Sequence, residues 1–492
     1  MSLAHLTIFI SRSALFPFNE RVIARYFILI YAACLLTAVA QSPVTLTVDT
    51  GSLGLIVPSD FIGLSFETGS LQYDSPGVKG YLFDPANTQL LTLFRNIGIK
   101  NLRIGGSSVD RNDADYLPAT KDIDVLFRFA RAGDLEVIYS LRLLNGDPSQ
   151  DAMTAQYVQD HYKQNLACFA IGNEPNLYGN RDPDMTNVPS FFIKWKRFAT
   201  AIVNAVPDAE IGGPDNGTGG ASWASFLAKQ ETGSRNTAYV FAHYYVGGNP
   251  RHKTPGQLVA GMLSSQWDTT KYPAYYAAVG AVALSEGFPY RLTELNNFVA
   301  NMPGVWGGNN SFATSLFALD CMHWWAAHQC TGVNFHTVIG KYNGTIYCDT
   351  NGNCQIWPIA YGIKAFDVGG HGRIDPVTIG NPDNLNLTAY AVTATNNDLF
   401  VTIINKENGA AARAASVTIT PKGFDRDTAK AIFLTAPGGN LQATSGITLG
   451  GAPILNNAPW DGRWTPLSPA SNAGCVVVVP AASAAIVKLS EH

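Results

Sequence analysis

The run CFAIGNE, residues 168–174, places apolar residues in a short segment and then changes abruptly to Asn and Glu. Similar short apolar runs recur between residues 61 and 340, separated by stretches with helical spacing. They are FIGLSFE (61–67), NLRIGG (101–106), EVIYSLRL (136–143), EIGGP (210–214), YVFAHYY (239–245), RLTELNNF (291–298) and GVNFHT (332–337). Eight strands that alternate with helices predict a (β/α)8 TIM barrel over residues 61–365, because that fold has a typical size of about 250 residues.

Two of the stretches between these runs show the helical spacing most clearly. In residues 189–206 the apolar side chains recur every three or four positions, at Phe191, Trp195, Phe198, Ile202 and Val206. Residues 84–98 open with Asp and Pro and close with Gly98, which also indicates a helix. An open doubly wound sheet is the alternative fold. The first strand, however, lacks the glycine-rich phosphate-binding sequence that follows it in such sheets.

The pattern changes at about residue 366, where short β-rich runs are separated by turn residues. Examples are LTAYAVTATNNDLFVTIINKE (387–407) and CVVVVPAASAAIVKLSE (475–491). They predict an antiparallel β-sandwich domain over residues 366–492. An earlier run, PVTLTVDT (43–50), alternates apolar and polar residues like a half-buried antiparallel strand. We therefore expect residues 41–60 to supply an N-terminal strand that completes the β domain.

Residues 25–41, RYFILIYAACLLTAVAQ, combine a basic flank, an apolar run and small residues before Gln41. This pattern predicts a signal peptide over residues 1–40 and a secreted, extracellular protein. An uncleaved membrane anchor is the alternative, but the apolar run is shorter than the roughly 20 residues that span a bilayer. We expect no stable membrane association.

Composition favours a neutral or sugar-like ligand over a polyanionic partner. Of the 492 residues, 46% are hydrophobic and 14% are charged, the formal net charge is −4, and Tyr (20) and Trp (9) are plentiful. Without a block of Lys or Arg, the chain lacks the electrostatic footprint of a nucleic-acid-binding protein. Neither a cofactor nor a metal ion is expected, because no His pair accompanies the cysteines and their spacing is not that of a zinc site.

Cysteines and sequons are consistent with secretion. Cys348 and Cys354 are the first and last residues of CDTNGNC. The turn-forming residues between them bring the two thiols together, so we predict a disulfide. The tripeptide N-x-S/T predicts glycosylation at four positions, although it also arises by chance. These are Asn216, Asn309, Asn343 and Asn386.

Two carboxylates stand where barrel strands end, which is where this fold places catalytic groups. Glu174 follows the fourth strand, and Glu294 lies among Leu292, Leu295 and Phe298 at the end of the seventh. The alternatives are a solvent-exposed turn for Glu174 and a salt bridge from Glu294 to Arg291 or another nearby Arg. A pair of carboxylates can cleave an acetal without a metal. Sequence gives no distance between them, so retention and inversion both stay open.

At these residues the chain resembles the clan A glycoside hydrolases, in which Asn-Glu after strand four supplies the acid/base and Glu on strand seven the nucleophile. Within that clan it is similar to glycoside hydrolase family 79, the family of β-glucuronidases and heparanases. The resemblance covers nearly the whole mature chain. It rests on FIGLSFE, LRIGGSSVD, IGNEPN, AHYY, TELNNF and the C-terminal β domain, which occur in the family's order.

The resemblance also implies supporting roles for six residues. Asn173 is expected to bond the sugar 2-hydroxyl, Glu67 and Asp110 to bind hydroxyls, Tyr245 to position Glu294, and His336 and Tyr342 to contact the sugar. Structural roles are the alternatives: a turn for Asn173, an ion pair with Arg111 or Arg103 for Asp110, and core packing for Tyr245. The glycine-rich loop 301–310 is either a source of backbone amides for a carboxylate or a plain connector.

The resemblance therefore implies a retaining glycosidase that removes β-linked glucuronic acid, with or without a 4-O-methyl group, from glycans. A heparanase-like endo-hydrolase is an alternative, which the lack of basic clusters disfavours. A clan A enzyme for neutral sugars is another. A carbohydrate-binding relic is the non-enzyme alternative, but such relics tend to lose one carboxylate and both are present here.

Overall fold

The computed structural model describes residues 42–490 apart from short gaps at 53, 75–76, 111–115, 183, 186, 248, 299–303, 340, 342–343, 425–427 and 469–473. The predicted signal peptide lies outside the described residues. Within the described part of the chain, no helix has both the length and the apolar character needed to cross a membrane.

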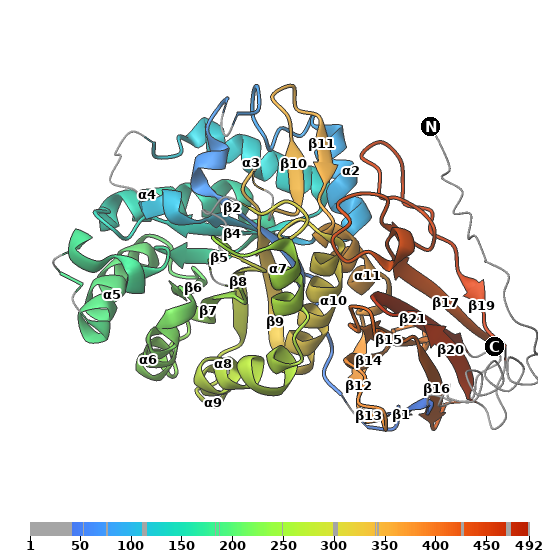
Figure 1. Cartoon of the computed structure of the whole chain (residues 1–492). Helices are drawn as coiled ribbons and strands as arrows, with labels where there is room; N and C mark the ends of the chain where they lie inside the picture. The colour runs from blue at the N-terminus through green and yellow to red at the C-terminus, as the bar shows by residue number, and fades with distance from the viewer. Residues whose placement is uncertain are drawn as a thin grey trace, which may run out of the picture. The chain divides into compact units, whose positions relative to one another are not determined.

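Eight parallel strands close into a barrel in the order β2 to β9, which confirms the predicted fold (Figure 1). Each predicted apolar run contributes one strand, with small differences at the ends. The strands are β2 (Ile62–Glu67), β3 (Asn101–Gly105), β4 (Glu136–Leu141), β5 (Leu166–Ile171), β6 (Ile211–Asn216), β7 (Thr237–Tyr245), β8 (Tyr290–Asn296) and β9 (Cys330–His336). The barrel closes because β9 also pairs with β2.

Helices surround the barrel and pack their apolar sides against it. The predicted helix at 84–98 is α2 (Thr88–Ile97), capped by the Asn87 side chain and ended by Gly98 at a φ of 79°. The predicted helix at 189–206 is α5 (Val188–Ala205), capped by Asn187. The others are α3 (Thr120–Gly133), α4 (Pro148–Tyr162), α6 (Ala221–Glu231), α7 (Pro255–Met262), α8 (Tyr272–Ala278), α9 (Gly280–Ser285), α10 (Phe312–Ala327) and α11 (Ile359–Gly369).

The C-terminal domain consists of two sheets that enclose a separate apolar core. One sheet has the order β13-β1-β16-β20, and the other runs β12-β14-β15-β21-β17-β18, with β19 paired to β17. The strands are β12 (Arg373–Asp375), β13 (Val377–Gly380), β14 (Leu387–Thr393), β15 (Leu399–Asn405), β16 (Ala415–Lys422), β17 (Thr428–Thr435), β18 (Thr448–Leu449), β19 (Thr465–Pro466), β20 (Cys475–Val479) and β21 (Ser483–Ser490).

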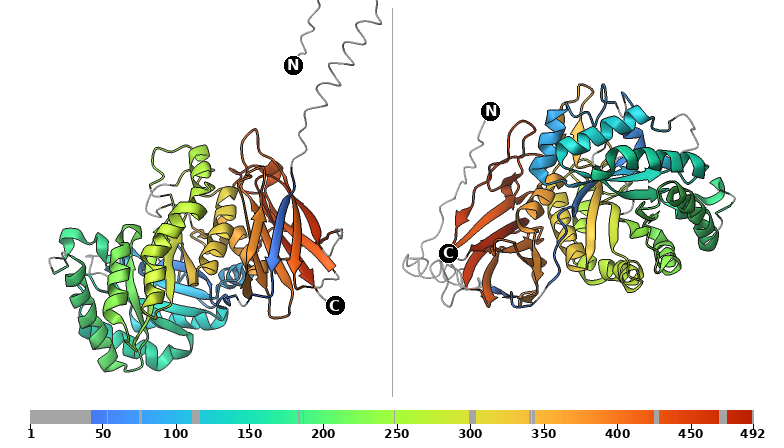
Figure 2. Two further views of the ribbon diagram at one scale, coloured as in Figure 1. Left: turned by 90° about the horizontal axis from the view of Figure 1, so that it is seen from below. Right: turned by 180° about the vertical axis from the view of Figure 1, so that it is seen from behind.

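The N-terminal strand β1 (Val44–Asp49) joins this domain, as the sequence predicted (Figure 2). Its pairing is mixed, however. β1 runs antiparallel to β13 but parallel to β16, so the predicted all-antiparallel arrangement is wrong for this one pair. The parallel pairing is possible because the whole barrel separates β1 from β16, so no hairpin fixes the relative direction of the two strands.

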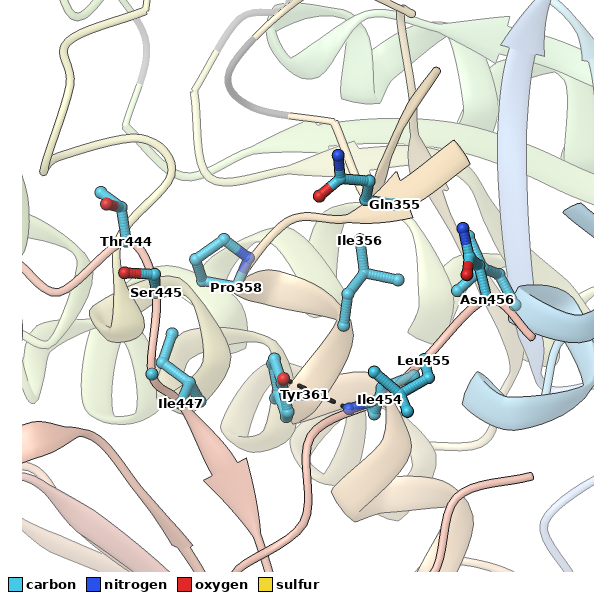
Figure 3. Close-up of a pocket in the computed structure, with 12 residues that line it drawn as sticks. Gln355, Ile356, Pro358, Tyr361, Thr444, Ser445, Ile447, Ile454, Leu455 and Asn456 are labelled. Carbon is cyan, nitrogen blue, oxygen red and sulfur yellow. Dashed lines mark hydrogen bonds between the residues drawn. The ribbon is translucent and has the colours of Figure 1, made fainter. Parts of the chain in front are cut away.

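The barrel ends later than the sequence indicated, because α11 runs on to Gly369, past the expected boundary at residue 365. Loop 440–456 of the β domain returns to pack on the barrel, and its Leu441 and Ile454 belong to the barrel's apolar core. A pocket of about 300 Å³ lies at this junction, and its lining residues are drawn in Figure 3. Within it, Tyr361 of α11 accepts a hydrogen bond from the Ile454 N–H at 3.3 Å. The two domains are thus joined by shared core residues.

A short hairpin after the last barrel strand carries the predicted disulfide. Strands β10 (Ile346–Cys348) and β11 (Cys354–Ile356) pair antiparallel, and Cys348 lies directly opposite Cys354. The two sulfurs are bonded, which confirms the prediction.

A buried charge cluster also connects barrel and β domain through Lys406, which follows β15. Its Nζ lies 2.6 Å from an oxygen of Asp268, on the π-helical turn η7 (Trp267–Lys271), and 2.6 Å from one of Asp320 on α10. The hydroxyls of Thr388 and Tyr390 donate to Asp320. Two carboxylates share one ammonium, and burial together with repulsion from Asp320 raises the pKa of Asp268 to about 7.

We expect Asp268 to make the protein lose stability as the pH rises from about 4 to about 7. Its pKa is about 7 in the folded chain and near 3.8 when unfolded, so the folded state holds an extra proton across this window. The contribution is complete below the lower pKa and is lost as the pH passes the upper one, at up to about 1.4 kcal/mol per pH unit. Asp268→Asn should flatten this slope in urea unfolding measured across the window. An unchanged slope would assign it to another group.

Candidate active site

A buried arginine organises the carboxyl end of the barrel. Arg103, on β3, is fully buried, and its guanidinium donates to four side chains from four other strands or strand ends. Nη1 lies 2.8 Å from Oε2 of Glu294 and 3.1 Å from Oγ of Ser65. Nη2 lies 2.8 Å from Oδ1 of Asn173 and 2.9 Å from Oδ2 of Asp215. The planar fork of arginine suits such multiple contacts, so Arg103 fixes these groups relative to one another.

Glu294, on β8, is held as a carboxylate. Tyr245 donates its hydroxyl to Oε1 at 2.6 Å, the contact predicted for that residue, and Arg103 bonds Oε2. Burial raises the pKa of Glu294, but His336, His243 and Arg103 together outweigh it and lower the pKa to about 2. The side chain keeps 9% of its surface exposed, so a ligand can still reach the charge.

Glu294 does not form the alternative ion pair with Arg291. Arg291 points to the opposite end of the strands, where its Nη1 lies 2.8 Å from Oδ2 of Asp60.

Glu174 follows β5 in a strained backbone conformation. Its φ of 48° lies in the left-handed region, which costs a residue with a side chain about 1–3 kcal/mol. The strain is held by its own N–H, which donates to the carbonyl of Asp215 at 2.8 Å, and Asp215 also has a positive φ, of 57°. The Glu174 side chain is 20% exposed, more than that of Glu294, and one of its carboxylate oxygens lies within 4.8 Å of one of Glu294.

His243, on β7, lies between the two carboxylates. Its Nδ1 is 3.1 Å from Oε1 of Glu174 and 3.8 Å from Oε2 of Glu294, while Nε2 is 3.4 Å from Oδ1 of Asp215. Burial lowers the pKa of His243, but Glu294, Asp215 and Glu174 raise it to about 9. The imidazole is therefore a buried cation at neutral pH.

Glu67 and His336 form a second acid–imidazole pair beside Glu294. Nε2 of His336 lies 3.6 Å from Oε1 of Glu67, and its Nδ1 lies 3.6 Å from Glu294. Burial raises the pKa of Glu67, but His336 and a hydrogen bond from Ser108 lower it overall. Gly106 permits this packing, because its φ is 70° and a Cβ there would lie 2.5 Å from the Glu67 carboxyl carbon. Both residues thus lie beside Glu294, and their expected contacts with the sugar stay predictions.

Asp110 has a different role from the predicted one. One carboxylate oxygen accepts the N–H groups of Leu143 and Leu144, and the other accepts the N–H of Asn173 and the hydroxyl of Tyr178. The residue is only 4% exposed and forms no ion pair with Arg103. Both oxygens are occupied, so Asp110 holds the loops after β4 and β5 instead of binding a sugar hydroxyl.

Burial contradicts two of the predicted glycosylation sites. Asn216 and Asn309 are 0% and 1% exposed, which leaves no room for a glycan on the folded chain. Asn309 instead accepts the N–H of Val305 and so folds part of the glycine-rich loop onto itself. Asn386 is partly buried, and its amide donates to the carbonyl of Leu263.

Three of the predicted features concern residues that the structure does not describe in full. Tyr342 and Asn343 lie outside the described residues, as do positions 301–303 of the glycine-rich loop.

Glu174, His243 and Glu294 also form the one group in the described part of the chain that could supply three metal ligands. One ligand atom from each lies within 4.8 Å of the others. Both oxygens of Glu294, however, already accept hydrogen bonds from Tyr245 and Arg103, and His243 is itself a cation. These features favour a charge-balanced acid–base cluster over a cation site.

Sequence reasoning missed the roles of Arg103, Asp215 and His243. Each is a charged or titratable residue inside an otherwise apolar strand, in LRIGG, IGGPDN and VFAHYY. A buried charge in such a strand needs a partner, and that requirement is the signal that could have found all three.

Comparisons with known proteins agree with the fold of the chain. Residues 389–486 match the glycosyl hydrolase family 79 C-terminal beta domain. No curated protein matches the chain in sequence. Among solved structures, a 4-O-α-L-rhamnosyl-β-D-glucuronidase from Fusarium oxysporum 12S aligns with a TM-score of 0.71 and 16% identity, covering 90% of this chain and 100% of its own. A family 51 arabinofuranosidase from Xanthomonas axonopodis pv. citri aligns with a TM-score of 0.68 and 14% identity, covering 91% and 100%.

The closed barrel, the carboxylates at its mouth and the attached β domain define a glycosidase. The family match itself covers the C-terminal domain, where residues 389–486 are similar to the C-terminal beta domain of glycosyl hydrolase family 79.

Proposed function

We propose that the protein hydrolyses β-glucuronides with retention of configuration, with Glu294 as nucleophile and Glu174 as acid/base. The observation that carries the mechanism is spacing. A carboxylate oxygen of Glu174 lies within 4.8 Å of one of Glu294. Carboxyl groups about 5–5.5 Å apart suit a double displacement, whereas inversion needs about 6.5–9.5 Å to admit a water molecule.

The two carboxylates differ in burial, because the Glu294 side chain is 9% exposed and the Glu174 side chain is 20% exposed. Glu294 is ionised and attacks the anomeric carbon, while Glu174 gives its proton to the departing glycosidic oxygen. Water then displaces Glu294 from the glycosyl–enzyme ester, and Glu174 takes the proton of that water. Asn173 presents its amide N–H₂ to the sugar 2-hydroxyl, because its carbonyl oxygen is already bonded to Arg103.

Glucuronic acid, with or without a 4-O-methyl group, is the proposed sugar, and a glycan that contains it is the proposed substrate. Support comes from the family 79 domain and from the glucuronidase named among the similar structures. Secretion stays a proposal too, supported by the leader-like residues 25–41 and by a disulfide, which forms in oxidising compartments.

Aryl glycoside hydrolysis tests this function. We expect a higher kcat/KM for aryl β-glucuronide than for aryl β-glucoside or β-xyloside. Glu174→Gln should lower kcat/KM by about 10²–10⁴-fold for leaving groups that need a proton. Glu136→Gln is the matched control, because Glu136 begins β4 at the opposite end of the barrel. Faster cleavage of the glucoside would contradict glucuronic acid as the substrate sugar. Full activity of Glu174→Gln on the same leaving groups would contradict the assignment of Glu174 as the acid.

A further inference from the structure

We propose that Asp215 is a positioning residue that holds both catalytic carboxylates through Arg103 and His243. This inference rests on the proposed function, since it takes Glu174 and Glu294 as the reacting groups. Asp215 itself cannot touch a substrate, because its side chain is 0% exposed. Its effect must therefore pass through its neighbours.

Asp215 reaches Glu174 by two routes. The carbonyl oxygen of Asp215 accepts the Glu174 N–H at 2.8 Å, so the backbone of β6 holds the strained residue. In addition, Oδ1 of Asp215 lies 3.4 Å from Nε2 of His243, whose Nδ1 lies 3.1 Å from Oε1 of Glu174. A carboxylate, an imidazole and a second carboxyl group thus stand in line.

Asp215 reaches Glu294 by two further routes. Oδ2 of Asp215 accepts from Nη2 of Arg103 at 2.9 Å, and Nη1 of the same guanidinium bonds Glu294 at 2.8 Å. Oδ1 accepts the hydroxyl of Thr293, the residue just before Glu294 on β8. A displacement of Asp215 would therefore move both the charge and the backbone next to the nucleophile.

Charge balance gives Asp215 a second reason to be present. His243 is faced by the carboxylates of Glu174, Glu294 and Asp215, and Arg103 lies beyond the last two. When Glu174 carries its proton, Arg103 and His243 supply two buried cations, and Glu294 with Asp215 supplies two anions. Without Asp215, one cation would be unbalanced, and His243 is the one that can give up its charge.

Asp215→Asn tests the inference, since it keeps the shape and removes the charge. We expect kcat to fall about 100-fold with little change in KM, as for a reacting group that is slightly misplaced. His243 holds its proton up to about pH 9. In the Asp215→Asn variant, NMR titration should show that the His243 imidazole loses its proton at lower pH. The alkaline limb of the pH profile of kcat should also move to lower pH. An unchanged titration with unchanged kcat would overturn the proposal.

Thr293→Val serves as the second variant in case Asp215→Asn fails to fold. Loss of the hydroxyl leaves Oδ1 of Asp215 with His243 alone, so the His243 titration should move to higher pH, the opposite direction. Asp375→Asn is the matched control: this buried aspartate also accepts a Thr hydroxyl, that of Thr393, but lies in the β domain. Movement of the His243 titration in the control, or no movement in Thr293→Val, would count against a specific role.

The NMR titration also separates the two proposals. If the wild-type protein cleaves no aryl glycoside, the proposed function fails, while the response of His243 to Asp215→Asn still decides whether Asp215 sets its charge. If the wild type is active and the titration does not respond, the positioning role alone fails.

Discussion

Glu294→Gly should abolish glycoside hydrolysis, with a loss in kcat on the order of 10⁴-fold or more. The surrounding cations hold Glu294 ionised, with a pKa of about 2, and its replacement by Gly leaves no atom to form the glycosyl ester. Hydrolysis of an aryl β-glucuronide measures the loss. The folded fraction should be checked by circular dichroism, because the substitution also leaves Arg103 without one of its partners.

Azide should restore turnover of Glu294→Gly and identify the role of the missing carboxylate. A small anion can occupy the space of the side chain and attack the anomeric carbon directly, so the product should be the inverted α-glycosyl azide. The same experiment on Glu174→Gly should give the β-azide, because Glu294 still forms the ester. If the two variants gave the opposite products, the roles of the two carboxylates would be reversed.

Arg103→Met should destabilise the protein by about 3–5 kcal/mol, the cost of removing one partner from a buried ion pair. Asp215 and Glu294 would both lose a cation, although their side chains are only 0% and 9% exposed. Urea unfolding at neutral pH measures the change. A loss below about 1 kcal/mol would mean that the neighbouring histidines compensate for the missing charge.

The same variant should also shift the acid limb of kcat/KM. Arg103 is one of the cations that lower the pKa of Glu294 to about 2, so its removal should raise that pKa and move the acid limb to higher pH. Arg291→Met is the control, because Arg291 forms its ion pair with Asp60 at the opposite end of the barrel. That variant should lose stability without moving the acid limb.

The barrel could be predicted because each strand carries its own signal. Strands such as FIGLSFE and CFAIGNE are apolar throughout, and amphipathic helices separate them, so local pattern and global fold agree. The parallel pairing of β1 with β16 could not be read in this way. Alternation in PVTLTVDT indicates a half-buried strand but says nothing about which neighbour it pairs with or in which direction.

The exposed residues of the site could be predicted from the sequence, but the roles of its buried residues could not. Glu174 and Glu294 stand out because polar residues interrupt strand ends, and Tyr245 ends the strand that precedes that of Glu294. Asp215 falls one residue beyond the strand end that the sequence suggested, and its partners come from three other strands. Asp110 was misjudged for the opposite reason: an acid after a strand also suits the capture of loop amides, and only the contacts distinguish the two uses.

The mixed pairing of β1 affects the order in which the chain can fold. Val44 lies opposite Val417, so the sheet joins residues separated by the entire barrel. Contacts this distant in sequence are slow to form, because the closure of so long a loop costs conformational entropy. During synthesis β1 cannot pair with β16 until β16 has emerged from the ribosome. If the chain were cut after α11, β1 would expose unpaired backbone N–H and C=O groups that can pair with another chain. The barrel should therefore aggregate and express poorly without its β domain.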